Sequence, residues 1–457
     1  MSRYLKIYAT VAAATIALVL AGCGQQALRS QANGQGAAFI AVPAAATTGQ
    51  LRTYYIAADE VLWDYAPHNT NDITGAPFTA DEDVFTKQGP NRIGHKYWKS
   101  LYRAYTDATF TKPVVRPTSC AATARACDDT LGMLGPVIRA VVGDTIKVVF
   151  KNNTSYPASI HPHGVFYQKD SEGSPYADGT SGADKADDAV PPNGTTTYNW
   201  AVPNRAGPGP MDGSSVLWMY HSHTDEVADT NAGLIGPMVI TARASADLAT
   251  ATPLDVDREV FSYFTVENEN NSQHLDRNLA QLAGPPHSIS TNDADAFEES
   301  NLMHSINGYV YGNGPVPTMR KGQRVRWYTF TLGTEVDLHT PHWHGNTETT
   351  NGMRSDMIQL MPGMMTVSDM TPDDVGTWLF HCHVNDHILA GMQARYRVTI
   401  SGRGEWAGPA NCSPDPPFAR PGGSQINRRI APQSWASQRT RRPMAAQQFS
   451  DRTLKSQ

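Results

Sequence analysis

Short runs in which apolar and polar residues alternate recur between residues 52 and 401 of this 457-residue chain. Residues 145–150 and 324–330 are two examples, and Gly, Pro and Asn separate such runs from one another. Because successive side chains of a β-strand point to opposite faces, this period of two predicts strands. Many short strands separated by turn residues favour an all-β fold of antiparallel sandwiches.

Two segments of the chain resemble each other. Residues 135–144 (GPVIRAVVGD) and residues 314–323 (GPVPTMRKGQ) each begin with Gly-Pro and lead towards a histidine-rich motif. Each half of the chain therefore contains one copy of the same pattern. We predict two domains, at residues 51–248 and 249–401, with the natural boundary near residues 245–255.

The two ends of the chain lack this pattern. Residues 7–21 are apolar, follow Arg3 and Lys6, and lead into Leu-Ala-Gly-Cys at residues 20–23, which resembles the lipobox of a bacterial lipoprotein. The apolar stretch is short for a membrane span. We expect a lipoprotein signal peptide at residues 1–22, lipidation of Cys23, a flexible tether at residues 23–50 and an exported, membrane-anchored bacterial protein on a periplasmic or extracellular face. The alternative is an ordinary signal peptide with an incidental cysteine.

Charge and cysteine content narrow the function further. The formal net charge is −6, and acidic and basic residues are mixed along the chain, so we expect no nucleic-acid partner. Residues 402–457, rich in Arg, Pro, Gln and Ser, predict a disordered basic tail. Cys120 and Cys127 are close enough for a disulfide in an oxidising compartment, Cys412 is left over, and no pair has Cys-x-x-Cys spacing.

Residues 381–392 (HCHVNDHILAGM) place one thiolate, three imidazoles and a thioether within twelve residues. Soft sulfur together with imidazoles selects copper. In a strand, Cys382 points to one face and its two histidine neighbours to the other, so one strand would serve two metal sites. Cys382, His387 and Met392 supply most of a blue-copper site. His339 can complete it, because it lies at an odd offset from the histidines that follow it.

Four His-x-His pairs remain, and their spacing places both members of each pair on one face of a strand. Eight imidazoles suit a three-copper cluster, whereas four such pairs are too many for ordinary hydrogen-bonded surface histidines. The pairs are His161 with His163, His221 with His223, His342 with His344, and His381 with His383.

With these motifs, residues 52–401 resemble the multicopper oxidases, and specifically the two-domain units of ceruloplasmin. The likeness extends beyond the copper motifs to residues 63–65 (WDY), 89–94 (GPNRIG), 228–237 (ADTNAGLIGP) and 305–309 (SINGY). The resemblance implies two cupredoxin-like Greek-key β-sandwich domains. It also implies four copper ions per chain: a type 1 ion that accepts electrons, and a type 2/type 3 cluster that reduces O2 to water.

The resemblance also implies a role for each ligand. Ser222 stands where the second half has Cys382, so we expect type 1 copper only in the second domain. Two-domain members of the family complete the cluster with a neighbouring subunit, which implies a homotrimer. The implied ligands are His339, Cys382, His387 and Met392 for type 1 copper, His161 and His342 for type 2, and His163, His221, His223, His344, His381 and His383 for type 3.

Ceruloplasmin-like ferroxidases place carboxylates and a histidine beside type 1 copper. Glu299, His304 and Asp386 match that pattern, and Glu335 matches a carboxylate supplied by a neighbouring unit. Hard carboxylate oxygens favour the higher charge state of iron. The resemblance therefore implies a ferroxidase that couples oxidation of Fe2+ to reduction of O2, with His387 passing the electron to copper.

Other functions use the same copper core. A laccase-like enzyme would oxidise phenols or another small reducing substrate. Cuprous-ion oxidation would draw on thioethers, which are soft ligands for Cu+, and the chain offers Met353, Met357, Met361, Met364, Met365 and Met370. Methionine is also a common core residue, and several of these positions alternate as they would in a buried strand. A copper-storage or interaction protein without catalysis is a further alternative.

A second kind of metal site concerns calcium. The acidic residues Asp184, Asp187 and Asp188 resemble a calcium-binding loop of ceruloplasmin, although a solvated charge run has the same composition.

Overall fold

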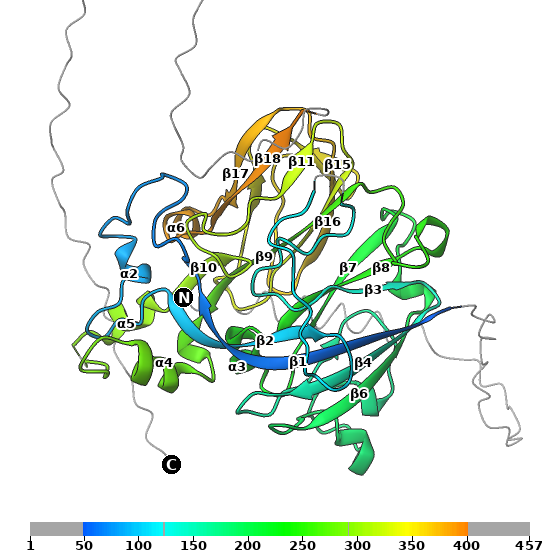
Figure 1. The fold of residues 1–457 in the computed structure, drawn as a ribbon, viewed down its shortest axis with the longest axis horizontal. Coiled ribbons are helices and arrows are strands. Elements are labelled where there is room, and N and C mark those ends of the chain that lie inside the picture. The colour runs from blue at the N-terminus through cyan, green and yellow to red at the C-terminus, as the bar shows by residue number, and fades with distance from the viewer. Residues whose placement is uncertain (1–48, 122–123, 291, 401–457) are drawn as a thin grey trace, which may run out of the picture. The chain divides into compact units, whose positions relative to one another are not determined.

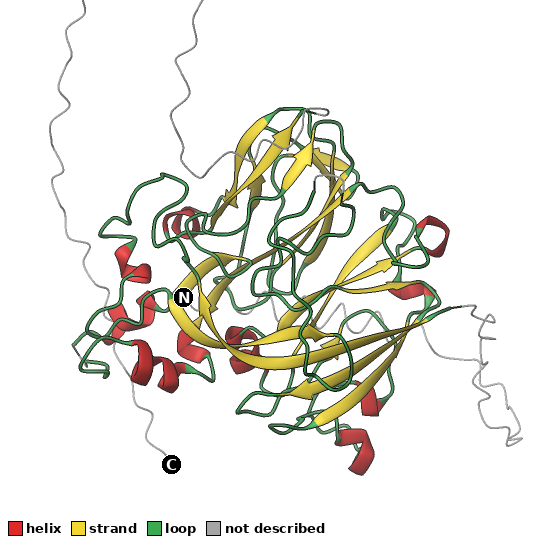
Figure 2. Cartoon of the chain, viewed as in Figure 1, coloured by secondary structure: helices red, strands yellow, loops and turns green. Residues whose placement is uncertain are grey.

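The computed structural model describes residues 49–121, 124–290 and 292–400, all within one compact unit. Strands dominate it and the helices are short (Figure 2). The predicted all-β class is confirmed. Among the described residues no helix is long and apolar enough to cross a membrane. The expected signal peptide, Cys23, most of the tether, Cys412 and the basic tail lie outside the described residues.

The first half forms two four-stranded sheets (Figure 1). One has the order β2-β1-β4-β6 and the other the order β3-β8-β7-β5. Their apolar faces enclose a core that includes Phe150, Tyr198 and Trp200. The strands are β1 (Leu51–Asp64), β2 (Lys96–Tyr105), β3 (Ile138–Val141), β4 (Thr145–Asn152), β5 (His161–Pro162), β6 (Thr195–Ala201), β7 (Ser215–His221) and β8 (Ile235–Thr241).

The second half repeats this arrangement. A six-stranded sheet has the order β10-β9-β12-β16-β14-β15, and a four-stranded sheet has the order β11-β18-β17-β13. Trp327, Trp343, Phe380 and Cys382 belong to the core between them. The strands are β9 (Arg258–Asn268), β10 (Leu302–Ile306), β11 (Thr318–Arg320), β12 (Val325–Phe330), β13 (Pro341–Trp343), β14 (Glu348–Thr350), β15 (Met353–Ser355), β16 (Met365–Met370), β17 (Gly376–Cys382) and β18 (Gln393–Thr399).

The internal repeat also appears in the strand pairing, and it corrects one expectation. Strand β1 is parallel to β4 as β9 is to β12, and β3 is parallel to β8 as β11 is to β18. The sheets are therefore mixed, not purely antiparallel as the sequence pattern suggested. The period of two reports which side chains are buried. It does not report strand direction, which the long connections determine.

Two hydrophobic clusters join the halves. The first packs Leu217, Met219 and Val239 against Phe261 and Tyr328. The second contains Tyr65, Tyr97, Phe297 and Met303 and lies close to helices that gather beside β10 (Figure 1). The α-helices of the whole described part of the chain are α2 (Asp83–Thr86), α3 (Glu226–Ala232), α4 (Leu275–Leu282), α5 (Ala294–Ser300) and α6 (Asn385–Leu389). Residues 245–255 lie between β8 and β9, and the domain boundary there stays a prediction.

Candidate metal centres

The first candidate centre combines two histidines with the free cysteine of the described part of the chain. His339 precedes β13, Cys382 ends β17 and His387 lies in α6. The Sγ atom of Cys382 lies 3.8 Å from Nδ1 of His339 and 3.6 Å from Nδ1 of His387. The two Nδ1 atoms are 3.1 Å apart, and all three residues are buried. A thiolate and two imidazoles therefore converge on one point.

Met392, the expected fourth residue of this centre, lies directly before the next strand, β18. Its side chain is fully buried in the same hydrophobic cluster as Cys382. Its backbone carbonyl accepts a hydrogen bond from the N–H of Cys382 at 3.1 Å, and its N–H donates to the carbonyl of His387 at 2.9 Å. The backbone thus keeps Met392 in register with both residues.

The surroundings of Cys382 favour its thiolate. Burial alone would raise the pKa of the thiol, but the contacts with His339 and His387 and with the backbone N–H groups of Thr340 and Val384 outweigh it and lower the pKa to about 6. The thiolate is the form that binds metals. At neutral pH this cysteine is therefore prepared to act as a ligand.

Asp337 supports the centre, and the sequence analysis missed it. Its Oδ1 atom lies 3.2 Å from Nε2 of His339 and accepts a hydrogen bond from the N–H of Val266, while Oδ2 accepts from the N–H of Thr334. A carboxylate only accepts, so Nε2 is the protonated nitrogen and neutral His339 keeps its lone pair on Nδ1, which faces Cys382. The spacing of two residues between Asp337 and His339 is the signal that could have revealed it.

The second candidate centre is a quartet of histidines in the second half. His342 and His381 are directly paired residues of β13 and β17. Nε2 of His381 lies 3.2 Å from Nδ1 of His342 and 3.0 Å from Nε2 of His344, and the ring of His383 is 5.3 Å from that of His342. Cys382, between two members of this quartet, belongs to the first centre. One strand therefore serves both centres, as its alternation predicted.

The third candidate centre is the matching quartet in the first half. His161 and His221 pair across β5 and β7, and Nε2 of His163 lies 3.1 Å from Nε2 of His221. The ring of His223 is 5.2 Å from that of His161. Burial lowers the pKa of His163 to about 4 and that of His221 to about 3. Both imidazoles are therefore neutral near pH 7, which is the form that binds metals.

A buried serine replaces the cysteine in the first half. The hydroxyl of Ser222 donates to Oδ2 of Asp229 at 2.6 Å and accepts from the N–H of Ser159 at 3.0 Å. This position therefore holds a hydrogen-bonded hydroxyl with no thiolate. A type 1 site in the first half lacks its essential ligand.

The described residues form few compact groups of three or more potential ligand atoms that all lie within 4.8 Å of one another. No such group combines histidines from both halves, and the first-half quartet forms no such group by itself. His163 and His223 are half-buried, and His383 is exposed. Each quartet therefore has members that reach solvent.

Each quartet also has a nearby carboxylate that the sequence analysis missed. Oε2 of Glu226 lies 3.4 Å from Nε2 of His223, and Oδ2 of Asp356 lies 3.5 Å from Nε2 of His342. Neither carboxylate has a distinctive spacing from its histidine, so sequence alone offered no signal.

The expected iron residues are only partly brought together. The ring of His304, on β10, lies 5.3 Å from that of His387. The three expected carboxylates are all exposed: Glu299 lies near the end of α5, Asp386 in α6 and Glu335 before β13. Within the described residues, these three carboxylates do not belong to any compact group of potential ligand atoms.

The remaining predicted residues lie apart from these centres. Cys120 and Cys127 form a disulfide with a Cα–Cα distance of 6.2 Å. In the acidic loop, Asp184 is exposed, buried Asp187 accepts from the N–H of Gly173, and Asp188 pairs with Lys185 at 3.1 Å. A lysine already neutralises part of this loop, and the calcium site stays a prediction.

Comparison with known proteins places this geometry in a family. Two sequence models described as multicopper oxidase match residues 119–245 and 283–402, which together make up more than half of the chain.

The chain belongs to the multicopper oxidase family.

Its relatives include ferroxidase HEPHL1 of Homo sapiens, 42% identical over 349 residues, which are 76% of this chain and 29% of that protein. Human hephaestin is 43% identical over 77% of this chain and 30% of its own length, and mouse ceruloplasmin is 41% identical over 76% and 32%. This multicopper oxidase therefore spans about a third of the length of these relatives.

The donor set of this multicopper oxidase fits copper. The first centre offers one buried thiolate and two imidazoles through Nδ1, which is the donor combination of type 1 copper. The quartets offer eight imidazoles, without thiolates, and imidazole is a good ligand for copper. The closed Cys120–Cys127 disulfide offers no competing thiolate.

Proposed function

We propose that this protein is a ferroxidase, which oxidises Fe2+ and reduces O2 to water. The observation that carries the proposal is the approach of His304 to His387, whose ring centroids are 5.3 Å apart. One is an expected iron ligand and the other an expected ligand of type 1 copper. A relative at 42% identity bears the name ferroxidase.

His304 is suited to hold a metal substrate. Its Nδ1 atom lies 2.9 Å from the carbonyl of Leu302, and because a carbonyl only accepts, Nδ1 carries the proton and Nε2 keeps a lone pair. Burial and the neighbouring His387 lower the pKa of His304 to about 4, so the ring is neutral near pH 7. Glu299 and Asp386 would add exposed, hard oxygen ligands, which favour Fe3+ over Fe2+.

Copper would occupy the three centres described above. One ion would be held by His339, Cys382, His387 and Met392. The two quartets would share three more ions. Bound copper supplies one-electron acceptance at the first centre and O2 reduction at the cluster. We infer that the first-half quartet of one subunit joins the second-half quartet of its neighbour, as the resemblance to two-domain members of the family implies. In support, no compact group of potential ligand atoms combines the two quartets within the described residues of one chain. Head-to-tail contacts that close give a ring, here a homotrimer in which Glu335 would reach the neighbour's iron site.

A second candidate function is cuprous-ion oxidation. Met353 and Met361 are 70% and 60% exposed, although buried methionine is the common case, and thioethers are soft ligands for Cu+. The phenol-oxidising alternative uses the same copper core.

The decisive experiment compares steady-state oxidation of Fe2+, Cu+ and a phenol by one copper-loaded preparation. Replacing both Glu299 and Asp386 with Ala should depress Fe2+ oxidation by about tenfold or more, or about 1.4 kcal/mol of transition-state stabilisation, and leave the blue colour and phenol oxidation intact. Equal losses for iron and phenol would instead make these carboxylates structural supports of the copper centre. No loss for either substrate would favour the laccase-like alternative.

We also propose that Cys23 carries a lipid anchor that keeps the protein at the outer side of a membrane. The support is the Leu-Ala-Gly-Cys sequence after an apolar stretch. A Cys23→Ser variant should no longer be found in the membrane fraction. Its retention in that fraction with unchanged gel mobility would contradict the proposal.

A further inference from the structure

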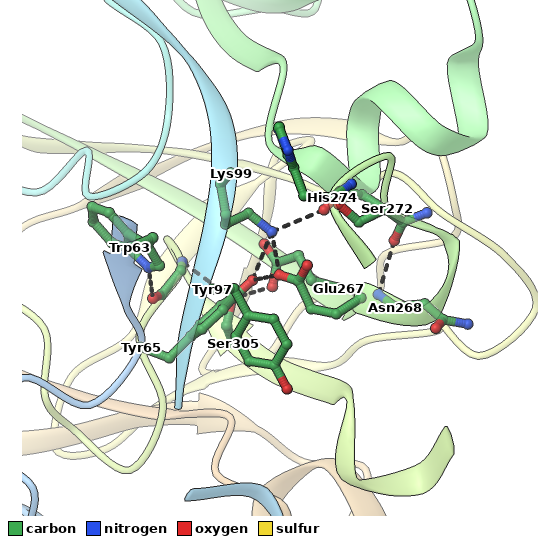
Figure 3. Close-up of polar contacts among 12 residues, drawn as sticks. Trp63, Tyr65, Tyr97, Lys99, Glu267, Asn268, Ser272, His274 and Ser305 are labelled. Carbon is green, nitrogen blue, oxygen red and sulfur yellow. Dashed lines mark hydrogen bonds and ion pairs between the residues drawn. The ribbon is translucent and has the colours of Figure 1, made fainter. Parts of the chain in front are cut away.

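A buried polar network joins the first half of the chain to the segment that carries the expected iron ligands (Figure 3). At its centre, Lys99 of β2 forms an ion pair with Glu269, and both side chains are fully buried. The ammonium group of Lys99 also donates to the hydroxyl of Tyr65 and to the carbonyl of Asn231, both at 2.8 Å. Tyr65 in turn donates to Oε1 of Glu269 at 2.6 Å. The ion pair therefore connects first-half strand β2 with the turn that follows β9.

That turn holds the segment containing Glu299. The backbone N–H of Glu269 donates to the carbonyl of Asn301 at 3.0 Å. The side chain of Asn270 accepts from the side chain of Asn301 and donates to the carbonyl of Glu298, both at 2.9 Å. Two consecutive residues of the turn thus fix the backbone on both sides of Glu299.

The first half also contacts this segment directly. The hydroxyl of Tyr97, on β2, donates to Oδ1 of Asn301 at 2.9 Å, and both residues are fully buried. Beyond β10, the indole N–H of Trp63 donates to the carbonyl of Gly308 at 2.7 Å. Between these contacts, the hydroxyl of Ser305 donates to Glu267 at 2.7 Å. The segment from Asn301 to Gly308, which contains His304 and begins two residues after Glu299, is therefore held at both ends by residues of the first half.

We infer that Tyr97, together with the Lys99–Glu269 pair, positions Glu299 relative to His304 and so sets the affinity for the metal substrate. These are positioning residues, because they act through Asn301 and the turn at Glu269. The inference rests on the ferroxidase function proposed above. It adds that iron affinity depends on first-half residues that do not reach the iron themselves.

A purely structural role would affect the protein differently. Removing one partner of a buried ion pair leaves an uncompensated charge and destabilises the whole fold, so Lys99 is a poor position for the test. Tyr97→Phe is milder, because it keeps the ring and removes only the hydrogen bond to Asn301. Tyr54→Phe is the control, because the Tyr54 hydroxyl bonds only within the first half: it donates to the carbonyl of Arg139 at 2.6 Å and accepts from its N–H at 2.8 Å.

The test uses the full-length, copper-loaded protein. Tyr97→Phe should raise KM for Fe2+ roughly fivefold, which corresponds to about 1 kcal/mol, the typical net worth of a neutral hydrogen bond. KM for a phenol and the blue absorption should not change. Binding of Mn2+, a divalent ion that also prefers carboxylates, should weaken by a similar factor in calorimetry. Tyr54→Phe should leave all four quantities unchanged.

Amide hydrogen exchange provides a readout that does not depend on the substrate. Tyr97→Phe should increase exchange in peptides covering residues 298–301 and Glu269, because local opening there loses one constraint. Unchanged exchange there, or increased exchange with unchanged KM for Fe2+ and unchanged Mn2+ binding, would overturn the inference. Failure of the proposed function would appear differently, as no preference for Fe2+ in the unmodified protein.

Discussion

The imidazole rings of His304 and His387 lie 5.3 Å apart, with their planes inclined by 53°. His304 comes from β10 and His387 from the short helix α6, two elements that are far apart in the sequence. His387 also faces Cys382, whereas the other side of His304 packs against Phe85. Only the imidazole ring of His387 would therefore separate a metal bound by His304 from the candidate copper centre.

Replacing His304 with Phe tests this relationship. Phenylalanine preserves the packing against Phe85 and His387 but has no lone pair for a metal. Fe2+ oxidation should fall about tenfold or more, equivalent to about 1.4 kcal/mol, while the blue absorption and the phenol rate should remain. Steady-state rates on the two substrates measure this. A parallel fall for phenol would mean that His304 only supports the copper centre.

Asp337 makes a separate prediction about the copper centre itself. In Asp337→Asn the side chain can donate through its amide, which would favour the His339 tautomer that has its proton on Nδ1, facing Cys382. Copper affinity at this centre should fall by about 10- to 100-fold, as is typical when the hydrogen-bond partner of a ligand is lost. The intensity of the thiolate-to-copper absorption during copper titration measures the affinity. An unchanged titration would rule out Asp337 as a partner of His339.

Much of this arrangement was predictable because side chains alternate in strands. Parity alone assigned Cys382 to one centre and its neighbours His381 and His383 to another, and strand β17 contains the first two of these residues and ends directly before His383. The grouping of the His-x-His pairs into two quartets does not follow from this rule, because it depends on which strands pair. Strand direction was not predictable, because parallel and antiparallel neighbours bury the same side chains.

Residues that act through long-range contacts left no signal in the sequence. Lys99 and Glu269 are 170 positions apart, and only the fold brings their charges together. A lone lysine in a strand is ordinarily a solvent-facing residue, so its complete burial could not be anticipated. The same holds for Asp356 beside His342, because the two belong to different segments of the second sandwich.

Glu267 provides a prediction about pH. Complete burial raises its pKa to about 8, although Lys99 and the hydrogen bond from Ser305 act in the opposite direction, and Glu269 and Asp337 add negative charge nearby. Between about pH 4.5 and pH 8 the folded protein therefore holds a proton that the unfolded chain releases. Stability should fall as pH rises through this window.

Glu267→Gln should remove this contribution, because the amide resembles the protonated acid and its oxygen can still accept from Ser305. Its melting temperature should equal that of the unmodified protein near pH 4.5 and exceed it near pH 8. Thermal unfolding measured at several pH values provides the comparison, with Glu298→Gln as a control at an exposed carboxylate. Parallel pH profiles for Glu267→Gln and the unmodified protein would show that Glu267 is ionised in the folded state.

The proposal that neighbouring subunits complete the cluster leads to a test by subunit mixing. His163→Ala damages the first-half quartet, and His344→Ala damages the second-half quartet. Each variant alone should lose nearly all oxidase activity, because every cluster lacks one imidazole. If neighbouring subunits complete the cluster, a mixed trimer contains at least one contact at which an intact first-half quartet meets an intact second-half quartet. Unfolding the two variants together, refolding them and loading copper should therefore restore part of the activity.

Mixing gives no such rescue if one chain builds its own cluster, because every chain then carries one damaged quartet. The control is a mixture of His163→Ala with His161→Ala, in which all first-half quartets are damaged and no contact is intact. Light scattering should show three chains for each species that regains activity, as a closed ring of head-to-tail contacts requires. A fully active monomer, or equal activity in the test and control mixtures, would contradict the proposed trimer and place the complete cluster within a single chain.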